Sequence, residues 1–234
     1  MPKNEPSTKI VNYYEKIPKE LLDNVPNPNL HLHHIKLPFR AVCCSPSGSG
    51  KTNFICNLIY LFSCGKTGTF STIHIITRNK DEPLYKYLQT KSQQIIIKEG
   101  IENIPPLDKF DKTEAHLVIF DDLQLAKDQS AIENYYIRAR KLNCSVVYLC
   151  QNYFKCPKTI RSNCNYMFIL KLNGDRECKM ILSDFGLGIT KDQLLHIYQY
   201  ATKEKFSPLL IDLEEDPTKR FRKGFDEVLD PSIF

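Results

Sequence analysis

A run of small side chains that ends in a lysine and a threonine has the clearest chemistry in the sequence. Residues 45–52 read Ser-Pro-Ser-Gly-Ser-Gly-Lys-Thr, which matches the phosphate-binding loop pattern G-x-x-x-x-G-K-[ST] except for Ser45 at the first glycine. Small residues let the backbone curl until its N–H groups point at phosphate oxygens, while Lys51 adds a positive charge and Thr52 a hydroxyl for Mg²⁺. The run therefore predicts a nucleotide site. The expected contacts come from Ser47, Gly48, Ser49, Gly50, Lys51, Thr52 and Asn53.

A pair of carboxylates follows an apolar run further along the chain. Residues 116–122 read His-Leu-Val-Ile-Phe-Asp-Asp, so Asp121 and Asp122 come where a predicted buried strand ends. We expect Asp121 to hold Mg²⁺, directly or through its water shell, and Asp122 to take a proton from an attacking water or to orient it. Asp122 could instead cap the following helix. Two carboxylates at one strand end are costly without a cation, which favours the Mg²⁺ interpretation.

A neutral amide ends a third apolar run. Residues 145–150 are followed directly by Gln151. At the end of a strand, Gln151 could lie beside the γ-phosphate, where it would distinguish ATP from ADP or orient the attacking water. Glutamine also caps many strand ends, so this hypothesis depends on the lysine and the carboxylates being its neighbours.

Alternating strands and helices would bring these groups to one edge of a sheet. From residue 37 onward, short β-rich apolar runs alternate with helical patterns. The predicted strands are 38–44, 72–77, 94–97, 116–120, 145–150, 166–172 and 209–213. The predicted helices are 51–62, 83–90, 129–142, 157–162, 175–182 and 191–202. This order indicates right-handed βαβ units, and therefore an α/β fold with a doubly wound, mainly parallel sheet.

The chain divides into an approach segment and one domain. Residues 1–36 hold five of the 14 prolines, so we predict a Pro-rich, partly irregular segment with one short helix near 18–23. Residues 37–234 form the predicted phosphate-loop domain, which ends in a mixed basic and acidic tail. A chain of 234 residues with 42% hydrophobic residues and a net charge of +5 is typical of an ordinary globular protein.

The remaining composition argues against a membrane span, a disulfide framework and a metal cluster. The longest apolar run, residues 54–62, is far shorter than the roughly 20 residues of a spanning helix, and we expect an intracellular protein. The nine cysteines have irregular spacings and no C-x-x-C pair, so reduced, mostly buried thiols are expected. His31, His33 and His34 have no acidic or cysteine partner nearby, which disfavours a metal site there.

Taken together, the motifs resemble those of a known family of viral motors. The segments SPSGSGKT, VIFDDLQ, YYIRARKLNCSVVYLCQNYF, PKTIRSNCNYMFILK and LLIDLEEDPTKRFRKGFDEV are similar to the genome-packaging ATPases of large nucleocytoplasmic DNA viruses and virophages. These are relatives of the poxvirus packaging ATPases within the FtsK–HerA superfamily. The resemblance covers about residues 37–229. Its specific parts are the paired aspartates, the arginine-rich helix end before the Gln151 strand, and the Ile-Arg-Ser-Asn segment at 160–163.

The resemblance implies a fold and roles for individual residues. The domain would be an additional-strand (ASCE-type) P-loop NTPase, with the strand that ends at Gln151 between the loop strand and the strand that ends at Asp121. Lys51 and Thr52 would bind ATP and Mg²⁺, Asp121 would hold the metal, Asp122 would be the general base and Gln151 the sensor. Either Arg138 or Arg140, with Arg140 preferred, would reach the γ-phosphate of a neighbouring subunit.

An arginine that acts between subunits implies a homo-oligomeric ring, of five or six subunits. Family members of this type use ATP hydrolysis to pull double-stranded DNA, independently of its sequence, into a preformed capsid. Expected partners are therefore DNA and a capsid or portal component, at the viral assembly site in the host cytoplasm or with the virion. Candidate DNA contacts are Lys155, Lys158 and Arg161, interleaved with Tyr153 and Phe154, and the basic residues 219–223.

Other classes of P-loop protein stay open. A small-molecule kinase, of the nucleoside or nucleotide type, would need an arginine-bearing lid and would not respond to DNA. A helicase or pilus-type motor of the same superfamily would need room for an accessory domain. A non-catalytic nucleotide-binding scaffold would have no use for Asp122 and Gln151 together.

Overall fold

The computed structural model of the chain describes residues 10–18, 25–65, 67–185 and 187–234, so the short helix predicted near 18–23 lies almost entirely outside the described residues. The strands of its sheet are β1 (Arg40–Cys44), β2 (Thr72–Thr77), β3 (Ile95–Glu99), β4 (His116–Asp121), β5 (Cys144–Cys150), β6 (Tyr166–Ile169), β7 (Leu209–Asp212), β8 (Phe221–Lys223) and β9 (Glu227–Val228). All seven predicted strands are present, and β8 and β9 are additional.

The helices from α2 to α7 agree closely with the predicted ones, whereas α1 was not predicted. The α-helices are α1 (Leu30–His33), α2 (Lys51–Ser63), α3 (Pro83–Gln89), α4 (Ser130–Arg138), α5 (Lys158–Asn163), α6 (Arg176–Phe185) and α7 (Lys191–Ala201). The short 3₁₀ helices are η1 (Tyr13–Lys16), η3 (Ile101–Asn103), η4 (Leu107–Lys109), η5 (Ala139–Leu142), η6 (Tyr153–Lys155) and η7 (Pro231–Ile233). The helix predicted over 129–142 is thus α4 followed by η5.

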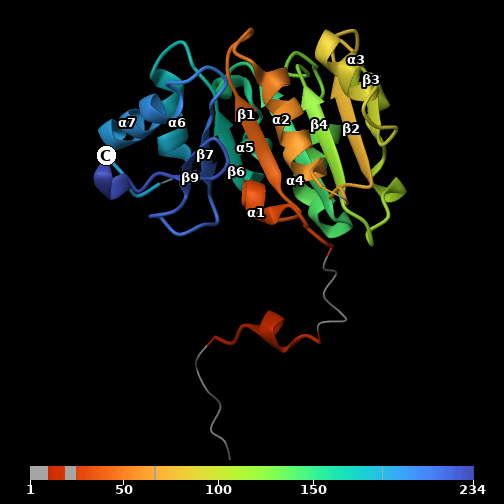
Figure 1. Cartoon of the computed structure of the whole chain (residues 1–234), viewed down its shortest axis with the longest axis horizontal. Coiled ribbons are helices and arrows are strands. Elements are labelled where there is room, and N and C mark those ends of the chain that lie inside the picture. Colours follow the sequence, from red (N-terminus) through yellow and green to blue (C-terminus); the bar gives the residue numbers. More distant parts are fainter. Residues whose placement is uncertain (1–9, 19–24, 66, 186) are drawn as a thin grey trace, which may run out of the picture.

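The sheet has the strand order β3-β2-β4-β5-β1-β6-β7-β8-β9 (Figure 1). The first six strands in this order are parallel to one another, and the pairs β6–β7, β7–β8 and β8–β9 are antiparallel. The α/β fold with a doubly wound, mainly parallel sheet is therefore confirmed. Strand β5, which Gln151 follows, lies between β4 and β1, as the family resemblance implies.

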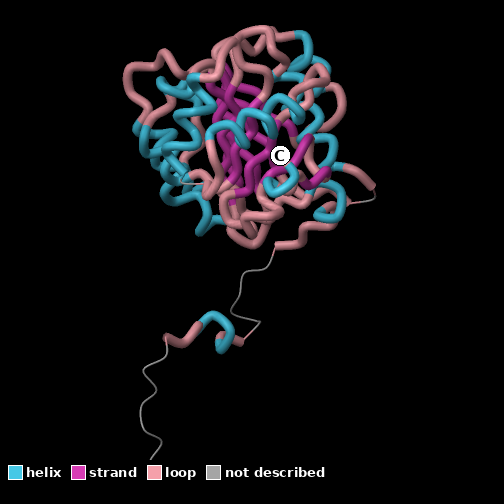
Figure 2. Tube along the Cα trace, turned by 90° about the vertical axis from the view of Figure 1, so that its left-hand side faces the viewer, coloured by secondary structure: helices cyan, strands magenta, loops and turns pink. Residues whose placement is uncertain are grey.

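Helices cover both faces of the sheet, which is the central layer in Figure 2. The helices α2 and α3 pack on one face, and α4, α5, α6 and α7 contribute their buried residues to the other. Strand β1 shows why the residues after Arg40 are all apolar. Ala41 and Cys43 belong to one hydrophobic cluster, while Val42 and Cys44 belong to the other. Burial on both faces of a parallel sheet explains the continuous apolar runs in the sequence.

The end of the approach segment packs against the domain. His33 in α1 is fully buried, and its ring lies 3.8 Å from that of Phe62 in α2, centroid to centroid. Burial lowers the pKa of His33 to about 4, so its ring is neutral at physiological pH. Arg222 in β8 donates hydrogen bonds to the backbone carbonyls of His33 and His34. His33 is therefore a core residue that joins α1 to the sheet.

The basic residues 219–223 do not form the exposed cluster that was a candidate DNA contact. Phe221 and Arg222 are buried in β8, and Arg222 forms an ion pair with Asp212 of β7 at 2.8 Å. Lys223 pairs with Glu204 at 2.7 Å. Arg222 and Lys223 are thus paired within the chain, whereas Lys219 is exposed and Arg220 donates to the backbone carbonyls of Leu187 and Glu215. The run as a whole is therefore not the exposed basic cluster that was expected.

Seven of the nine cysteines are buried and all nine are free, which confirms the expectation of mostly buried thiols. Within the described residues, no helix is long and apolar enough to cross a membrane. The same residues contain no group of three or more His, Cys, Asp or Glu side chains that could hold a metal ion.

Candidate nucleotide site

The predicted phosphate-binding loop joins the end of β1 to the start of α2. Gly48 and Gly50 have φ angles of 76° and 98°, in the left-handed region that favours glycine. Ser45, at the position of the missing first glycine, is fully buried, and its N–H donates to the carbonyl of Cys150 in β5 at 3.1 Å. The Ser49 hydroxyl lies 2.6 Å from the Ser45 hydroxyl and donates to the Pro46 carbonyl. Serine at position 45 is therefore part of the internal bonding of the loop.

Lys51 is the first residue of α2 and is only 9% exposed. Its Nζ donates to the carbonyls of Ser45 at 2.7 Å and Pro46 at 2.9 Å. These bonds hold the ammonium within the curve of the loop, close to the positive end of the α2 dipole. A positive charge in this place attracts the phosphates of a nucleotide.

Asp121 ends β4 and is held by two hydroxyl groups. The Tyr85 hydroxyl from α3 donates to Oδ2 of Asp121 at 2.6 Å, and the Thr77 hydroxyl donates to the same oxygen at 3.3 Å. Burial raises the pKa of Asp121, and the negative charge of Asp122 adds to that effect, while the Tyr85 hydrogen bond and Lys51 oppose it. A buried carboxylate with these neighbours is stabilised by a cation.

The residues that were predicted to hold Mg²⁺ suit that ion. Thr52 and Asp121 line one cavity, and their side chains offer the hydroxyl and carboxylate oxygens that Mg²⁺ prefers. Tyr85 was not predicted as a site residue. The sequence pattern around Tyr85 does not indicate this role, because its partner Asp121 is far away in the sequence.

Asp122 and Gln151 are joined directly. Nε2 of Gln151 donates to Oδ1 of Asp122 at 2.6 Å, which links the ends of β4 and β5. Asp122 has a φ of 52°, and this turn of the backbone directs its side chain across the sheet edge. Gln124 holds the pair in place, because its Oε1 accepts from the Gln151 N–H at 3.1 Å and its Nε2 donates to the Asn152 carbonyl.

One cavity of about 520 Å³ contains most of the predicted site. It is lined by nine of the residues that the sequence singled out, namely Ser47, Gly48, Gly50, Lys51, Thr52, Asn53, Asp121, Asp122 and Gln151. Ser49 lies on the other side of the loop and lines the neighbouring cavity. Among the lining residues that were not predicted, Phe206 and Arg78 have notable positions. Phe206 lines both cavities, and Arg78, which follows β2, lines a third one with Asp122 and Gln151.

Arg138 and Arg140 lie at the opposite edge of the sheet. Both are exposed, and they come just before Cys144, the first residue of β5, whereas Gln151 follows the last. A strand of seven residues, such as β5, spans roughly 20 Å. Neither arginine lines the cavity of its own chain. If they act on a nucleotide, they do so on that of another subunit.

The candidate DNA-contacting residues after Gln151 divide into two groups. Tyr153 is buried, and its hydroxyl donates to Asp184. Arg161 forms an ion pair with the same carboxylate and packs over the Tyr153 ring, so its charge is used inside the chain. Lys155 and Lys158 are exposed. Lys155 lines the third cavity, the one that it shares with Arg78 and Asp122. These two lysines remain candidates for a phosphate-facing surface.

The strand order, the loop between β1 and α2, and the polar residues after β4 and β5 define a P-loop NTPase of the additional-strand type. Residues 31–212 match the family described as Poxvirus A32 protein, and the chain belongs to this family. This confirms the resemblance to poxvirus-type packaging ATPases.

Named relatives are poxvirus proteins. The DNA packaging protein OPG160 of vaccinia virus (strain Copenhagen) is 30% identical over 199 residues, which cover 77% of this chain and 71% of that protein. The DNA packaging protein OPG160 of Monkeypox virus is also 30% identical, over 77% of this chain and 64% of that protein.

Solved structures have the same fold at low sequence identity. B204, the DNA-packaging ATPase from Sulfolobus Turreted Icosahedral Virus, superposes with a TM-score of 0.55 and 14% identity, over 76% of this chain and 94% of that one. EssC (ATPases 2 and 3) from Geobacillus thermodenitrificans has a TM-score of 0.52 and 9% identity, over 83% of this chain and 40% of that one. The fold is therefore one that this DNA-packaging ATPase and the EssC ATPases share.

Proposed function

We propose that this chain is an ATP-hydrolysing motor that moves double-stranded DNA and packages a viral genome into a preformed capsid. The observation that carries the proposal is the contact between Asp122 and Gln151, 2.6 Å apart within the phosphate-loop cavity. A protein that only binds nucleotide has no need of a carboxylate and an amide paired beside the phosphates. The names of the poxvirus relatives support DNA packaging as the purpose of the hydrolysis.

The residues of the cavity have separate roles in this proposal. The backbone N–H groups of residues 47–53 and the Lys51 ammonium bind the phosphates of ATP. Thr52 and Asp121 would hold Mg²⁺, which would neutralise phosphate charge. Asp122 accepts the proton of the attacking water, and Gln151 orients Asp122 and senses the γ-phosphate.

The arginines extend the site across a subunit boundary. Arg138 or Arg140, exposed at the far edge of the sheet, stabilises the γ-phosphate in the neighbouring subunit, so the active form is a ring of five or six copies. Lys155 and Lys158 contact DNA phosphates without reading sequence. The ring docks on a capsid or portal component at the viral assembly site in the host cytoplasm.

The test is ATP hydrolysis by the purified chain with and without double-stranded DNA, at low and at moderate salt, beside Lys51→Ala. The proposal expects stimulation by DNA that weakens as salt rises, because phosphate contacts release counterions. The Lys51→Ala protein should not hydrolyse ATP under any of these conditions. Hydrolysis by the wild type that is indifferent to DNA at every salt concentration would contradict a DNA motor.

A further inference from the structure

An exposed phenylalanine lies directly on the phosphate-binding loop. Phe206 belongs to the connection between α7 and β7 and is 42% exposed. Its ring is so close to Gly50 that a side chain there would meet Cδ1 of Phe206 at 2.3 Å. Phe206 also has a φ of 69°, in a region that a bulky residue rarely adopts. A large apolar ring in a strained turn, half open to solvent, contributes little to a core and points to a binding role.

The topology explains how this turn reaches the loop. Leu209, which begins β7, pairs with Ile169 at the end of β6, and Ile169 pairs with Cys44 at the end of β1. The connection before β7 therefore emerges at the same sheet edge as the phosphate-binding loop. It does so on the β6 side of β1, whereas Gln151 and Asp121 lie on the β5 side.

This arrangement fixes the direction of a bound nucleotide. The γ-phosphate must lie near Asp121, Asp122 and Gln151, because these residues act on the metal and on the attacking water. The phosphate chain then runs along the loop, and the nucleoside leaves at the other end. That end is the side on which Phe206 lies.

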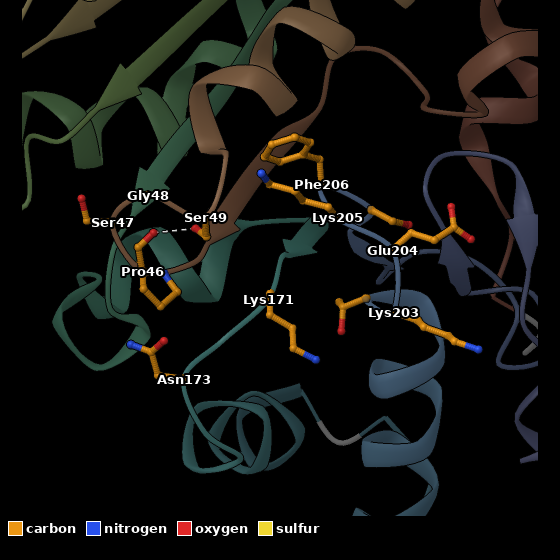
Figure 3. A pocket seen from close by; sticks show the side chains of 12 residues that line it. Pro46, Ser47, Gly48, Ser49, Lys171, Asn173, Lys203, Glu204, Lys205 and Phe206 are labelled. Atoms are coloured by element: carbon orange, nitrogen blue, oxygen red, sulfur yellow. Dashed lines mark hydrogen bonds between the residues drawn. The ribbon is translucent and has the colours of Figure 1, made fainter.

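A second cavity opens at this place. It has a volume of about 420 Å³ and lies between the outer side of the loop and the residues from Thr202 to Ser207 (Figure 3). Lys171 and Asn173, which follow β6, form its third side. The Lys205 ammonium lies 4.8 Å from the centre of the Phe206 ring. The cavity thus combines an aromatic face with polar groups, which suits a nucleobase and its ribose.

We propose that Phe206 is the side chain on which the base of the bound nucleotide stacks, and that residues 202–207 form the base-binding turn. This rests on the proposed function in two respects, that the loop binds a nucleotide and that its γ-phosphate lies beside Asp121, Asp122 and Gln151. It does not depend on DNA or on a ring. Neither the family motifs nor the phosphate-binding residues assign any role to this turn.

Binding of two ligands separates base stacking from phosphate binding. Calorimetry would compare Mg²⁺·ATP with Mg²⁺·tripolyphosphate, which has the phosphates but no base. Phe206→Ala should weaken ATP binding by roughly ten-fold or more, the scale of lost base–aromatic stacking, and change tripolyphosphate binding by less than about two-fold. Tyr87→Ala is a matched control, because Tyr87 is also an exposed ring beside a lysine, Lys91, but belongs to α3.

A fluorescent variant gives a second measurement. The chain contains no tryptophan, so Phe206→Trp introduces a single reporter at this position. Its emission should be quenched by ATP and not by tripolyphosphate. Unchanged ATP affinity in Phe206→Ala would overturn the proposal, and so would an equal loss for both ligands, which would mean that Phe206 only supports the loop. A wild-type chain that binds neither ligand would instead overturn the nucleotide site itself.

Discussion

Gln151 donates a hydrogen bond from Nε2 to Oδ1 of Asp122 at 2.6 Å, across the ends of the neighbouring strands β5 and β4. The bond depends on the strand order, because only the insertion of β5 between β4 and β1 brings this amide between the carboxylates and the phosphate-binding loop. It also fixes which oxygen of Asp122 remains free to accept a proton.

Asp122→Asn should separate binding from hydrolysis. The asparagine oxygen can still accept the Gln151 hydrogen bond, but the side chain cannot take up a proton from water. We expect turnover to fall by roughly 10²- to 10⁴-fold, the usual contribution of a general base. ATP affinity, measured by calorimetry, should stay within about three-fold, since the phosphate contacts come from other residues. Wild-type turnover in this variant would remove Asp122 from the mechanism.

In the absence of metal, the stability of Asp121→Asn relative to wild type should increase as pH rises. Burial raises the pKa of Asp121 in the folded chain above its unfolded value, so stability present at low pH is lost as pH rises through the folded pKa. Asparagine does not titrate. The free energy of unfolding of the variant, relative to wild type, should therefore increase from about pH 4 to about pH 7 in buffer with EDTA.

Denaturant titrations at several pH values measure this difference. With Mg²⁺·ATP added at neutral pH, the wild type should become the more stable of the two proteins. Only the wild type gains stability from a ligand that needs the carboxylate. A relative stability of the variant that falls with increasing pH would show that Asp121 is held in its charged form by the protein alone.

Arg222→Met should destabilise the chain strongly. Arg222 is 4% exposed and pairs with Asp212, which is 1% exposed, so methionine would leave a buried carboxylate without its partner. The expected loss in the free energy of unfolding is about 3–5 kcal/mol. Lys223→Ala is the matched control in the same strand. Its partner Glu204 is exposed, so the loss should be far smaller than that of Arg222→Met. Equal losses in the two variants would refute this assignment.

Subunits with Arg140→Ala should reduce the ATPase activity of adjacent wild-type subunits in mixed assemblies. Because the arginine lies far from the cavity of its own chain, one mutant subunit would disable the site of an adjacent wild-type subunit. ATPase activity should therefore fall more steeply than the fraction of mutant chains. The same titration with Arg138→Ala identifies which arginine acts. A strictly proportional decrease with both variants would argue against an arginine that acts between subunits.

The elements and the position of the loop between β1 and α2 could be predicted because their signals are local. A strand buried on both faces is a continuous apolar run, and the phosphate-binding loop has a fixed spacing at a strand-to-helix junction. The position of the Gln151 strand came from the family resemblance, since no local pattern sets the order of parallel strands.

The rest depends on partners that are distant in the sequence. Arg222 looks like part of a solvated charge run until β7 brings Asp212 beside it. Tyr85 is one tyrosine among 12 until the fold places its hydroxyl 2.6 Å from Asp121. Phe206 gives no signal at all without the contact to Gly50. Tertiary contacts of this kind decide burial and pKa, and no periodicity records them.

Displacement of a triplex-forming strand from double-stranded DNA shows whether the protein moves along the duplex. A protein that moves along the duplex with ATP removes the third strand, whereas one that only binds DNA leaves it in place. We predict ATP-dependent displacement by the wild type, and none by Asp122→Asn under conditions where that variant binds both ATP and DNA. A triplex that persists while the wild type hydrolyses ATP at its DNA-stimulated rate would contradict a DNA-moving motor.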